Sequence, residues 1–211
     1  KILLDEIDFE NVGFALKMPQ DSLFVRTMLP KTTLKNGVID LKEASYYVKS
    51  FGIDNAELAY GPKEELFLQQ IGLQLDSIYY CGKDIRANIE EFVLKERSGL
   101  ELVSTEGRIV SDSVLIEIPK FTMKTTASSL DLQTKIGWDV LEMKKTGVLS
   151  AKINAEIGKG DVAKILGGRD TLFLQTYPNK PFVFRADAEG DLKRLRLRTL
   201  EAGLAKAFEL K

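Results

Sequence analysis

The sequence predicts an all-β protein on three observations. Through residues 94–138, apolar side chains fall on alternate positions, the period that places neighbouring side chains on opposite faces of a strand. Short groups of small and polar residues, such as Ser111-Asp112-Ser113, interrupt the alternation where turns would join antiparallel strands. Apolar residues spaced three or four apart, which mark amphipathic helices, are scarce. We therefore expect mostly strand, with helix confined chiefly to residues 161–166.

The stretch from Leu94 to Trp138 carries the strongest signal and predicts a β-meander of at least three strands joined by short turns. Its alternating apolar residues are Leu100, Leu102, Val114, Ile116, Ile118, Phe121, Met123, Leu130, Leu132, Ile136 and Trp138. If the last strand has no bulge, even spacing places Leu130, Leu132, Ile136 and Trp138 on one face.

The N-terminal residues 1–18 alternate more loosely. Their phase slips at Asp5-Glu6 and again at Asn11. These slips predict a strand with a bulge, or a hairpin at Glu10-Asn11.

The next segment is predicted to contain several short strands. The first, at 23–29, is expected to stop at Pro30-Lys31. Lys35-Asn36-Gly37 predicts a hairpin turn, because Asn and Gly both tolerate positive φ. Asp54-Asn55 is expected to separate two further strands. The strands after the hairpin are expected at 38–41, 46–53, 57–60 and 78–80.

The C-terminal third predicts a mixture of strands and one short helix. After a strand at 148–157, Asp161 is a suitable helix N-cap and Gly167 a suitable residue just past the C-terminus. Strands are expected again at 172–175 and 182–188. Residues 191–211 fit either an amphipathic helix or two strands, and we favour two strands.

Composition sets the broad class. The chain has 211 residues, 44% of them hydrophobic and 29% charged, with a net charge of −1. No Pro- or Ser-rich linker divides it, so we expect residues 1–211 to form a single β-rich domain. The balanced charge favours no nucleic-acid partner. A compact sandwich and an extended, strongly curved sheet both accommodate this many strands.

Residue types argue against catalysis. The chain has no histidine, which excludes histidine bases, histidine-dependent nucleophiles and histidine metal sites. Its one cysteine, Cys81, excludes an intramolecular disulfide and a cysteine zinc site. Adjacent carboxylates such as Glu64-Glu65 point to opposite strand faces, and Gly158-Lys159-Gly160-Asp161 lacks the full phosphate-loop spacing. We expect no enzyme activity, no metal and no cofactor.

Several segments together resemble a known family. The residues that carry the resemblance are LKERSGLEL at 94–102, Glu106-Gly107-Arg108, Asp112-Ser113, Pro119-Lys120-Phe121, Ser128-Ser129-Leu130, the segment 80–85 and the segment 190–195. This pattern resembles the AsmA/TamB-like translocation-and-assembly proteins of diderm bacteria, especially the Bacteroidetes type. The resemblance covers most of residues 30–211 and is best at 78–138.

The resemblance implies both an architecture and a function. The architecture is an elongated, curved β-trough with an apolar inner face. The function is a hydrophobic conduit for phospholipid acyl chains, or the assembly of outer-membrane proteins with an Omp85-type barrel partner. The chain would be a segment of a longer periplasmic protein anchored in the inner membrane, which agrees with its start at Lys1 rather than at an initiator Met. The implied groove residues are Ile116, Ile118, Leu130, Leu132, Ile136 and Trp138. The alternative is a non-catalytic β-sandwich spacer or adhesin-like module.

Overall fold

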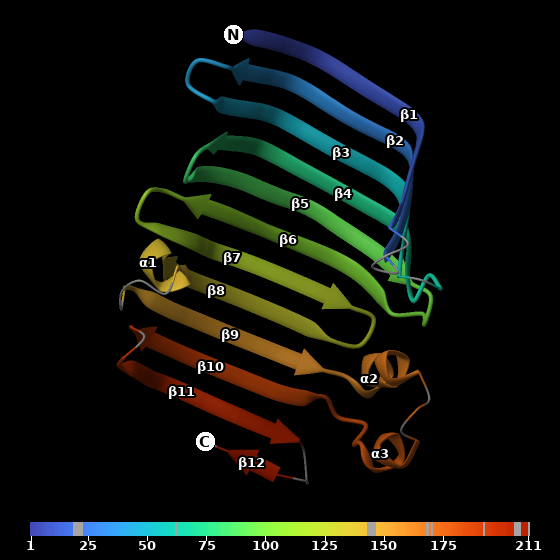
Figure 1. The fold of residues 1–211 in the computed structure, drawn as a ribbon. Coiled ribbons are helices and arrows are strands. Elements are labelled where there is room, and N and C mark those ends of the chain that lie inside the picture. The colour runs from blue at the N-terminus through green and yellow to red at the C-terminus, as the bar shows by residue number, and fades with distance from the viewer. Residues whose placement is uncertain are drawn as a thin grey trace.

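The computed structural model describes residues 1–18, 23–61, 63–142, 147–167, 169, 171–191, 193–204 and 208–210. Over these ranges the chain forms one antiparallel sheet of twelve strands, whose order in space is their order in the sequence (Figure 1). The predicted all-β, curved, antiparallel fold is confirmed.

The strands are β1 (Ile2–Met18), β2 (Leu23–Asp40), β3 (Ser45–Tyr60), β4 (Leu66–Cys81), β5 (Asp84–Glu96), β6 (Glu101–Ser111), β7 (Leu115–Thr125), β8 (Ser129–Gly137), β9 (Leu149–Ile157), β10 (Phe182–Gly190), β11 (Leu195–Leu204) and β12 (Phe208–Leu210). Three short helices stand at the ends of strands β8 to β10: α1 (Trp138–Leu141), α2 (Lys159–Leu166) and α3 (Thr171–Thr176).

Strands β1–β4 are long because the predicted breaks are bends rather than ends. Asn11 in β1, Asn55 in β3 and Gln70 in β4 have positive φ values of 54°, 54° and 53°. The register places Asn11 and Asn55 opposite Pro30, on either side of β2, and places Gln70 near the same row in β4. A left-handed residue shifts the alternation by one position and turns the strand without ending it. Figure 1 shows β1 and β2 turning sharply before they end.

The predicted break at Asp54-Asn55 is therefore wrong. The slip at Asn11 lies inside a continuous strand, where Asn11 has positive φ and the pairing with β2 stays one residue to one. The strand expected to stop at Pro30-Lys31 also continues, and Lys31 pairs with both Glu10 and Asp54. Pro30 lies opposite Asn11, between the pairs Lys31–Glu10 and Leu29–Val12.

The predicted hairpin at Asn36-Gly37 is wrong as well. A type I′ turn needs positive φ at both central residues, but only Asn36 has one, at 52°. Gly37 instead pairs with Val48 inside the sheet. A Cβ atom on Gly37 would lie 3.2 Å from Leu34 Cδ2, so this glycine serves close packing.

A bulge also explains why the apolar pattern of β7 changes phase. Ile118 pairs with Thr134, and Phe121 pairs with Leu132, so β7 has one more residue than β8 over this interval. The extra residue falls at Pro119-Lys120 and returns Phe121 to the face of Ile118.

The C-terminal third confirms some expectations and corrects others. The short helix is present as α2, and Gly167 follows it in the left-handed conformation. Its N-cap is Gly158 rather than Asp161. The expected strand at 172–175 is helix α3. Because β9 and β10 pair directly with each other, the sheet has no position left for such a strand. Two strands in the last segment are confirmed as β11 and β12.

The fold has almost no buried apolar core. Among the described residues, only Ala56, Ala59, Val140 and Tyr177 are buried hydrophobics. The accessible surface is 13810 Å², against about 9,800 Å² for a compact protein of this mass. The sheet therefore forms a single layer with both faces largely uncovered. In the described ranges, no helix is both long enough and apolar enough to cross a membrane.

Candidate functional site: an uncovered apolar trough

The register carries one apolar row across the sheet from β1 to β11. Directly paired residues on neighbouring strands point to the same face, so consecutive pairs trace a line across it. This line, which we call the apolar row, is Ile7, Leu34, Phe51, Leu75, Ile89, Gly107, Phe121, Leu132, Ile153, Ala186 and Leu200. It contains no polar side chain.

The neighbouring row has the opposite character. It consists of Glu6, Lys35, Ser50, Asp76, Asn88, Arg108 and Lys120, which point to the other face. Glu6 and Lys35 form an ion pair of 2.8 Å within it. The strands thus place apolar side chains on one face and charged or polar side chains on the other, as in antiparallel sheets that have one face in water.

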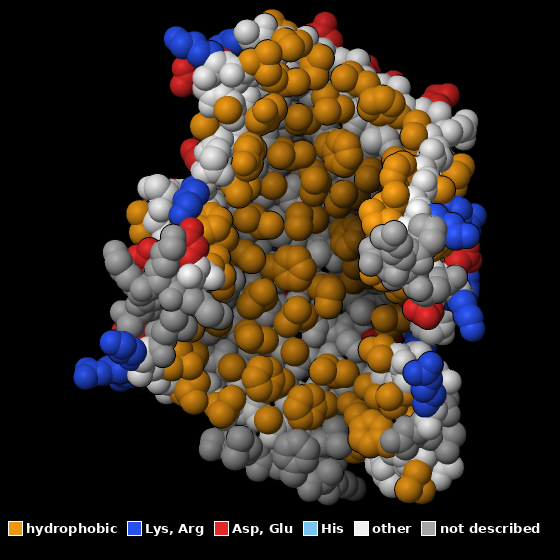
Figure 2. All heavy atoms as spheres, viewed as in Figure 1, with side chains coloured by type: hydrophobic (Ala, Val, Ile, Leu, Met, Phe, Trp, Pro, Cys, Tyr) orange, Lys and Arg blue, Asp and Glu red, His pale blue; other side chains and the backbone are white. Residues whose placement is uncertain are grey.

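The apolar face is the hollow one, and we call it the trough face. Figure 2 shows hydrophobic side chains covering the hollow from the N-terminal to the C-terminal strands, with charged groups gathered at the edges of the view. Many trough-face residues remain well exposed, including Phe9 at 50% and Phe14 at 55%. The hollow is therefore lined rather than filled by side chains.

Five of the six groove residues implied by the resemblance lie on the trough face. Leu132 belongs to the apolar row, and Ile136 pairs with Ile116 on one side and Leu149 on the other. Ile118 and Leu130 occupy positions of the same parity in β7 and β8. All five are partly exposed.

Trp138 lies outside the strand that was expected to carry it. Strand β8 ends at Gly137, and Trp138 is the first residue of α1. Its indole N–H donates a 2.7 Å hydrogen bond to the Asp112 carbonyl, and Lys83 Nζ lies 4.8 Å from its ring centroid. Trp138 thus fastens α1 to the turn before β7.

The sequence interpretation missed the N-terminal half of the trough. Phe51, Leu75 and Ile89 belong to the apolar row, yet the bends shift the alternation on either side of them. The signal that would have found them is a spacing of two with occasional steps of three at Asn or Ser, since Asn11, Asn36 and Ser77 all have positive φ.

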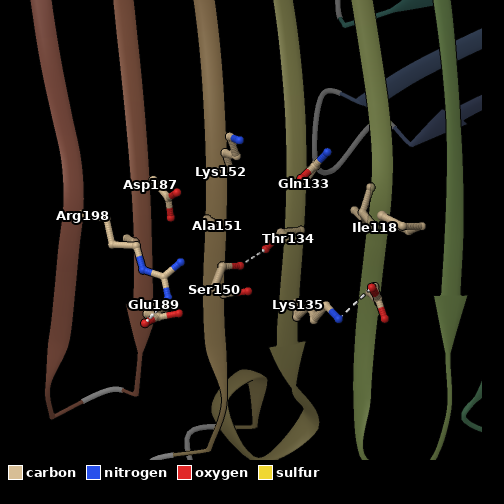
Figure 3. A pocket seen from close by; sticks show the side chains of 13 residues that line it. Ile118, Gln133, Thr134, Lys135, Ser150, Ala151, Lys152, Asp187, Glu189 and Arg198 are labelled. Atoms are coloured by element: carbon tan, nitrogen blue, oxygen red, sulfur yellow. Dashed lines mark hydrogen bonds and ion pairs between the residues drawn. The ribbon is translucent and has the colours of Figure 1, made fainter.

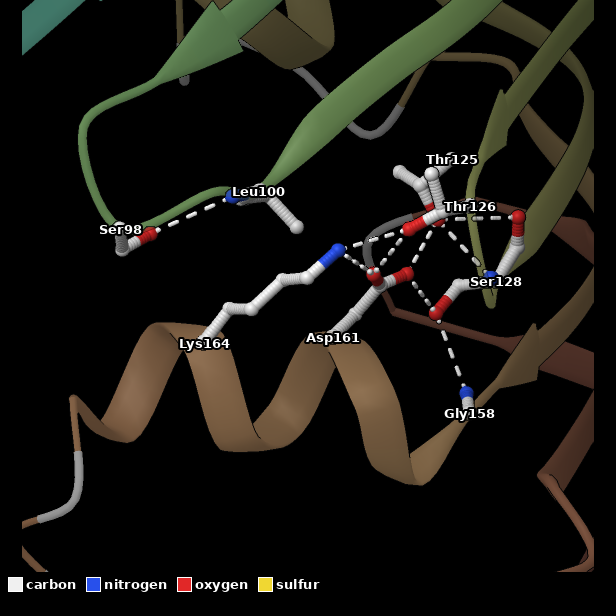
Figure 4. Close-up of polar contacts among 8 residues, drawn as sticks. All are labelled: Ser98, Leu100, Thr125, Thr126, Ser128, Gly158, Asp161 and Lys164. Atoms are coloured by element: carbon white, nitrogen blue, oxygen red, sulfur yellow. Dashed lines mark hydrogen bonds and ion pairs between the residues drawn. The ribbon is translucent and has the colours of Figure 1, made fainter.

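Helix α2 is fastened to one end of the sheet by a buried carboxylate. Asp161 is 2% exposed and accepts hydrogen bonds from the hydroxyls of Ser128 at 2.6 Å, of Thr126 at 3.3 Å, and of Thr125 (Figure 4). Lys164 Nζ lies 3.8 Å from the same carboxylate. Burial alone would raise the pKa of Asp161, but the hydroxyl donors and Lys164 outweigh it and hold the pKa below its ordinary value.

A hollow on the opposite face is polar. It encloses about 370 Å³ between β7 and β11, where charged and amide side chains of the outward rows meet (Figure 3). Lys135 pairs with Glu117 at 2.9 Å, and Arg198 pairs with Glu189. Opposite charges neutralise each other here. Nowhere among the described residues do three or more metal-ligating side chains gather.

The Asp112-Ser113 pair serves the turn before β7. Asp112 Oδ1 accepts hydrogen bonds from the backbone N–H of Val114 at 2.7 Å and of Leu115 at 2.9 Å. These bonds hold the pKa of Asp112 below its ordinary value, and the bond from Leu115 has the larger effect of the two. Ser113 is exposed in the bend.

The trough is therefore the most prominent candidate site, and its chemistry is that of apolar contact. No family model, curated protein or solved structure matches this chain.

Proposed function

We propose that this chain is a hydrophobic trough that carries phospholipid acyl chains, as part of an AsmA/TamB-like periplasmic protein working between the inner and outer membranes. One observation carries the proposal: an unbroken apolar row crosses eleven strands and no second layer of described residues covers it. The periplasmic location, and an Omp85-type partner reached through other parts of a longer protein, belong to the same proposal and depend on the sequence resemblance.

The energetics support an apolar occupant. The chain exposes about 4,000 Å² more surface than a compact protein of its mass, and the trough face contributes apolar area to that excess. Each methylene group that moves from water onto such a face gains about 0.8 kcal/mol. Acyl chains bind by this effect alone, without a specific pocket or a polar constellation.

The dimensions also suit a conduit rather than a closed pocket. Eleven strands spaced by about 4.8 Å give the apolar row a length of about 50 Å. The row runs perpendicular to the strands, so an occupant sliding along it meets apolar side chains at every step. A sandwich spacer would bury this face under a second sheet, and the single sheet argues against that alternative.

The test is native mass spectrometry of protein purified from cells, with Ile136→Arg as the trough variant. Ile136 is partly exposed, so the arginine stem can lie along Ile116 and Leu149 while the guanidinium reaches water. We expect a soluble variant with a cooperative melt and reduced co-purified phospholipid.

The matched control is Gln133→Arg, which places the same charge on the outward face of the same strand. It should leave lipid content unchanged. A bare wild-type protein, or full lipid occupancy in a folded Ile136→Arg protein, would contradict the proposal. Insoluble Ile136→Arg protein would indicate that the trough is closed around a sealed core.

A further inference from the structure

The longest connection in the sheet is folded into a projection at one rim of the trough. Residues 158–181 separate β9 from β10, although Ile157 and Phe182 pair directly. A short turn would join them equally well, as it joins β5 to β6. The chain instead builds α2 and α3 beside the ends of β9 and β10 (Figure 1). We call residues 158–181 the rim segment.

The rim segment is held rigidly at its base. Besides the Asp161 cluster, the Gly158 N–H donates to Ser128 Oγ at 3.1 Å. Tyr177 is buried, and its hydroxyl donates a 2.9 Å hydrogen bond to the Ile157 carbonyl. A Cβ atom on Gly158 would lie 2.1 Å from the Ala127 carbonyl oxygen, so only glycine allows this close approach.

The outer surface of the same segment is apolar. Leu172 is 74% exposed, Ile165 is 68% exposed and Phe173 is 45% exposed. Leu172 is the most exposed large hydrophobic residue in the described part of the chain. Side chains this exposed bury little area and so contribute little to the stability of the fold. They leave apolar surface in contact with water, which is unfavourable.

The rim segment carries a net positive charge. Among the described residues of the rim segment, the exposed charged side chains are Arg169 and Lys180. The segment has four basic and two acidic residues, and of the acidic ones Asp161 is buried, while Asp170 lies outside the described residues.

The rim segment thus combines three exposed large apolar side chains with two exposed basic side chains among its described residues. Basic groups beside apolar ones suit a surface that is anionic and has an apolar interior.

We propose that the rim segment is a contact site for the surface of a bilayer that contains anionic phospholipid. Ile165, Leu172 and Phe173 enter the boundary between headgroups and acyl chains, and Arg169 and Lys180 lie among the phosphates. The inference goes beyond acyl-chain carriage, since it concerns the outside of the molecule and holds whether or not the trough contains lipid.

Vesicle flotation tests it, with vesicles of phosphatidylcholine alone and of phosphatidylcholine mixed with phosphatidylglycerol. The wild-type protein should float with the mixed vesicles, and added salt should release it. The double variant Ile165→Ser/Leu172→Ser should lose at least about tenfold in partitioning, because two exposed apolar side chains no longer insert.

The matched control is Leu3→Ser/Leu41→Ser, which removes two residues of similar exposure, 73% and 69%, away from the rim segment. It should float like the wild type. Equal loss in both double variants, equal binding to neutral vesicles, or no binding by the wild type would each overturn the proposal. Far-UV circular dichroism confirms that all variants are folded.

Two measurements separate this inference from the trough function. Ile136→Arg should still float with the mixed vesicles, and Ile165→Ser/Leu172→Ser should still carry co-purified lipid in native mass spectrometry. If Ile136→Arg alone abolishes flotation, the vesicles bind through the trough and the rim assignment fails.

Discussion

At the scale of single residues, Asp161 does more for the fold than its position in a short helix suggests. It is the most buried charged side chain in the described ranges, and three hydroxyls from the β7–β8 turn converge on it. Sequence reasoning assigned it to a helix cap because cap and anchor use the same residue type. Only the register, which brings residues 125–128 beside 158–161, distinguishes the two roles.

Asp161→Ala should lower the free energy of unfolding by about 2 kcal/mol at neutral pH, because it leaves buried hydroxyls and Lys164 without their acceptor. The loss should become smaller in acid. A carboxyl whose folded pKa is depressed stabilises the fold above its unfolded pKa and loses that contribution as the pH falls through the folded pKa. Urea titrations from pH 7 downward should therefore show the difference between wild type and variant narrowing as the pH falls below about 4.

The control for this titration is Asp131→Ala, an exposed carboxylate on the outward face of β8. It should change the unfolding free energy by less than about 0.5 kcal/mol at any pH. A pH-independent loss in Asp161→Ala would mean that packing, rather than charge, holds α2 in place.

At the scale of elements, the bends in the long strands depend on left-handed residues. Asn55 is exposed and has a φ of 54°. Its role is therefore to adopt the left-handed backbone conformation rather than to pack against other side chains. Asn55→Val should cost about 1–3 kcal/mol, because a β-branched residue is strained at positive φ. Asn55→Gly should be close to neutral. Chemical denaturation of the pair measures the difference, and equal stability of the two variants would show that the bend does not need a left-handed residue.

These bends also explain where sequence reasoning succeeded and failed. The strands between Leu115 and Ile157 were predicted well, since Leu130, Leu132 and Ile136 alternate without interruption. Asn36-Gly37 predicted a turn because a hairpin turn and a positive-φ bend inside a strand favour the same residue types. The difference lies in the partner: Val48 on β3 continues the ladder past Gly37, and no local pattern contains that information. Residues 172–175 were predicted as a strand for the same reason. They form helix α3 because the direct pairing of β9 with β10 excludes them from the sheet.

At the scale of the whole molecule, the uncovered trough should have a thermodynamic signature. A globular chain of 211 residues unfolds with a heat-capacity increase of about 2.5–3.2 kcal/mol/K. Apolar surface that is already wet in the folded state contributes nothing, and each 1,000 Å² of it lowers the increase by about 0.45 kcal/mol/K. Scanning calorimetry of delipidated protein should give a value well below this range, and a normal value would mean that the trough closes in solution.

The order of the strands has a consequence for how the molecule is made. Because every strand pairs with its immediate neighbours in sequence, even wide pairs such as Ile2 with Ile39 or Leu149 with Gly190 join residues of a single hairpin. Such a topology has low contact order, and closing its loops requires little entropy. No strand must wait for a distant partner or be threaded between two others. The sheet can therefore grow vectorially, adding one strand at a time as the chain emerges, with each completed edge serving as the template for the next strand.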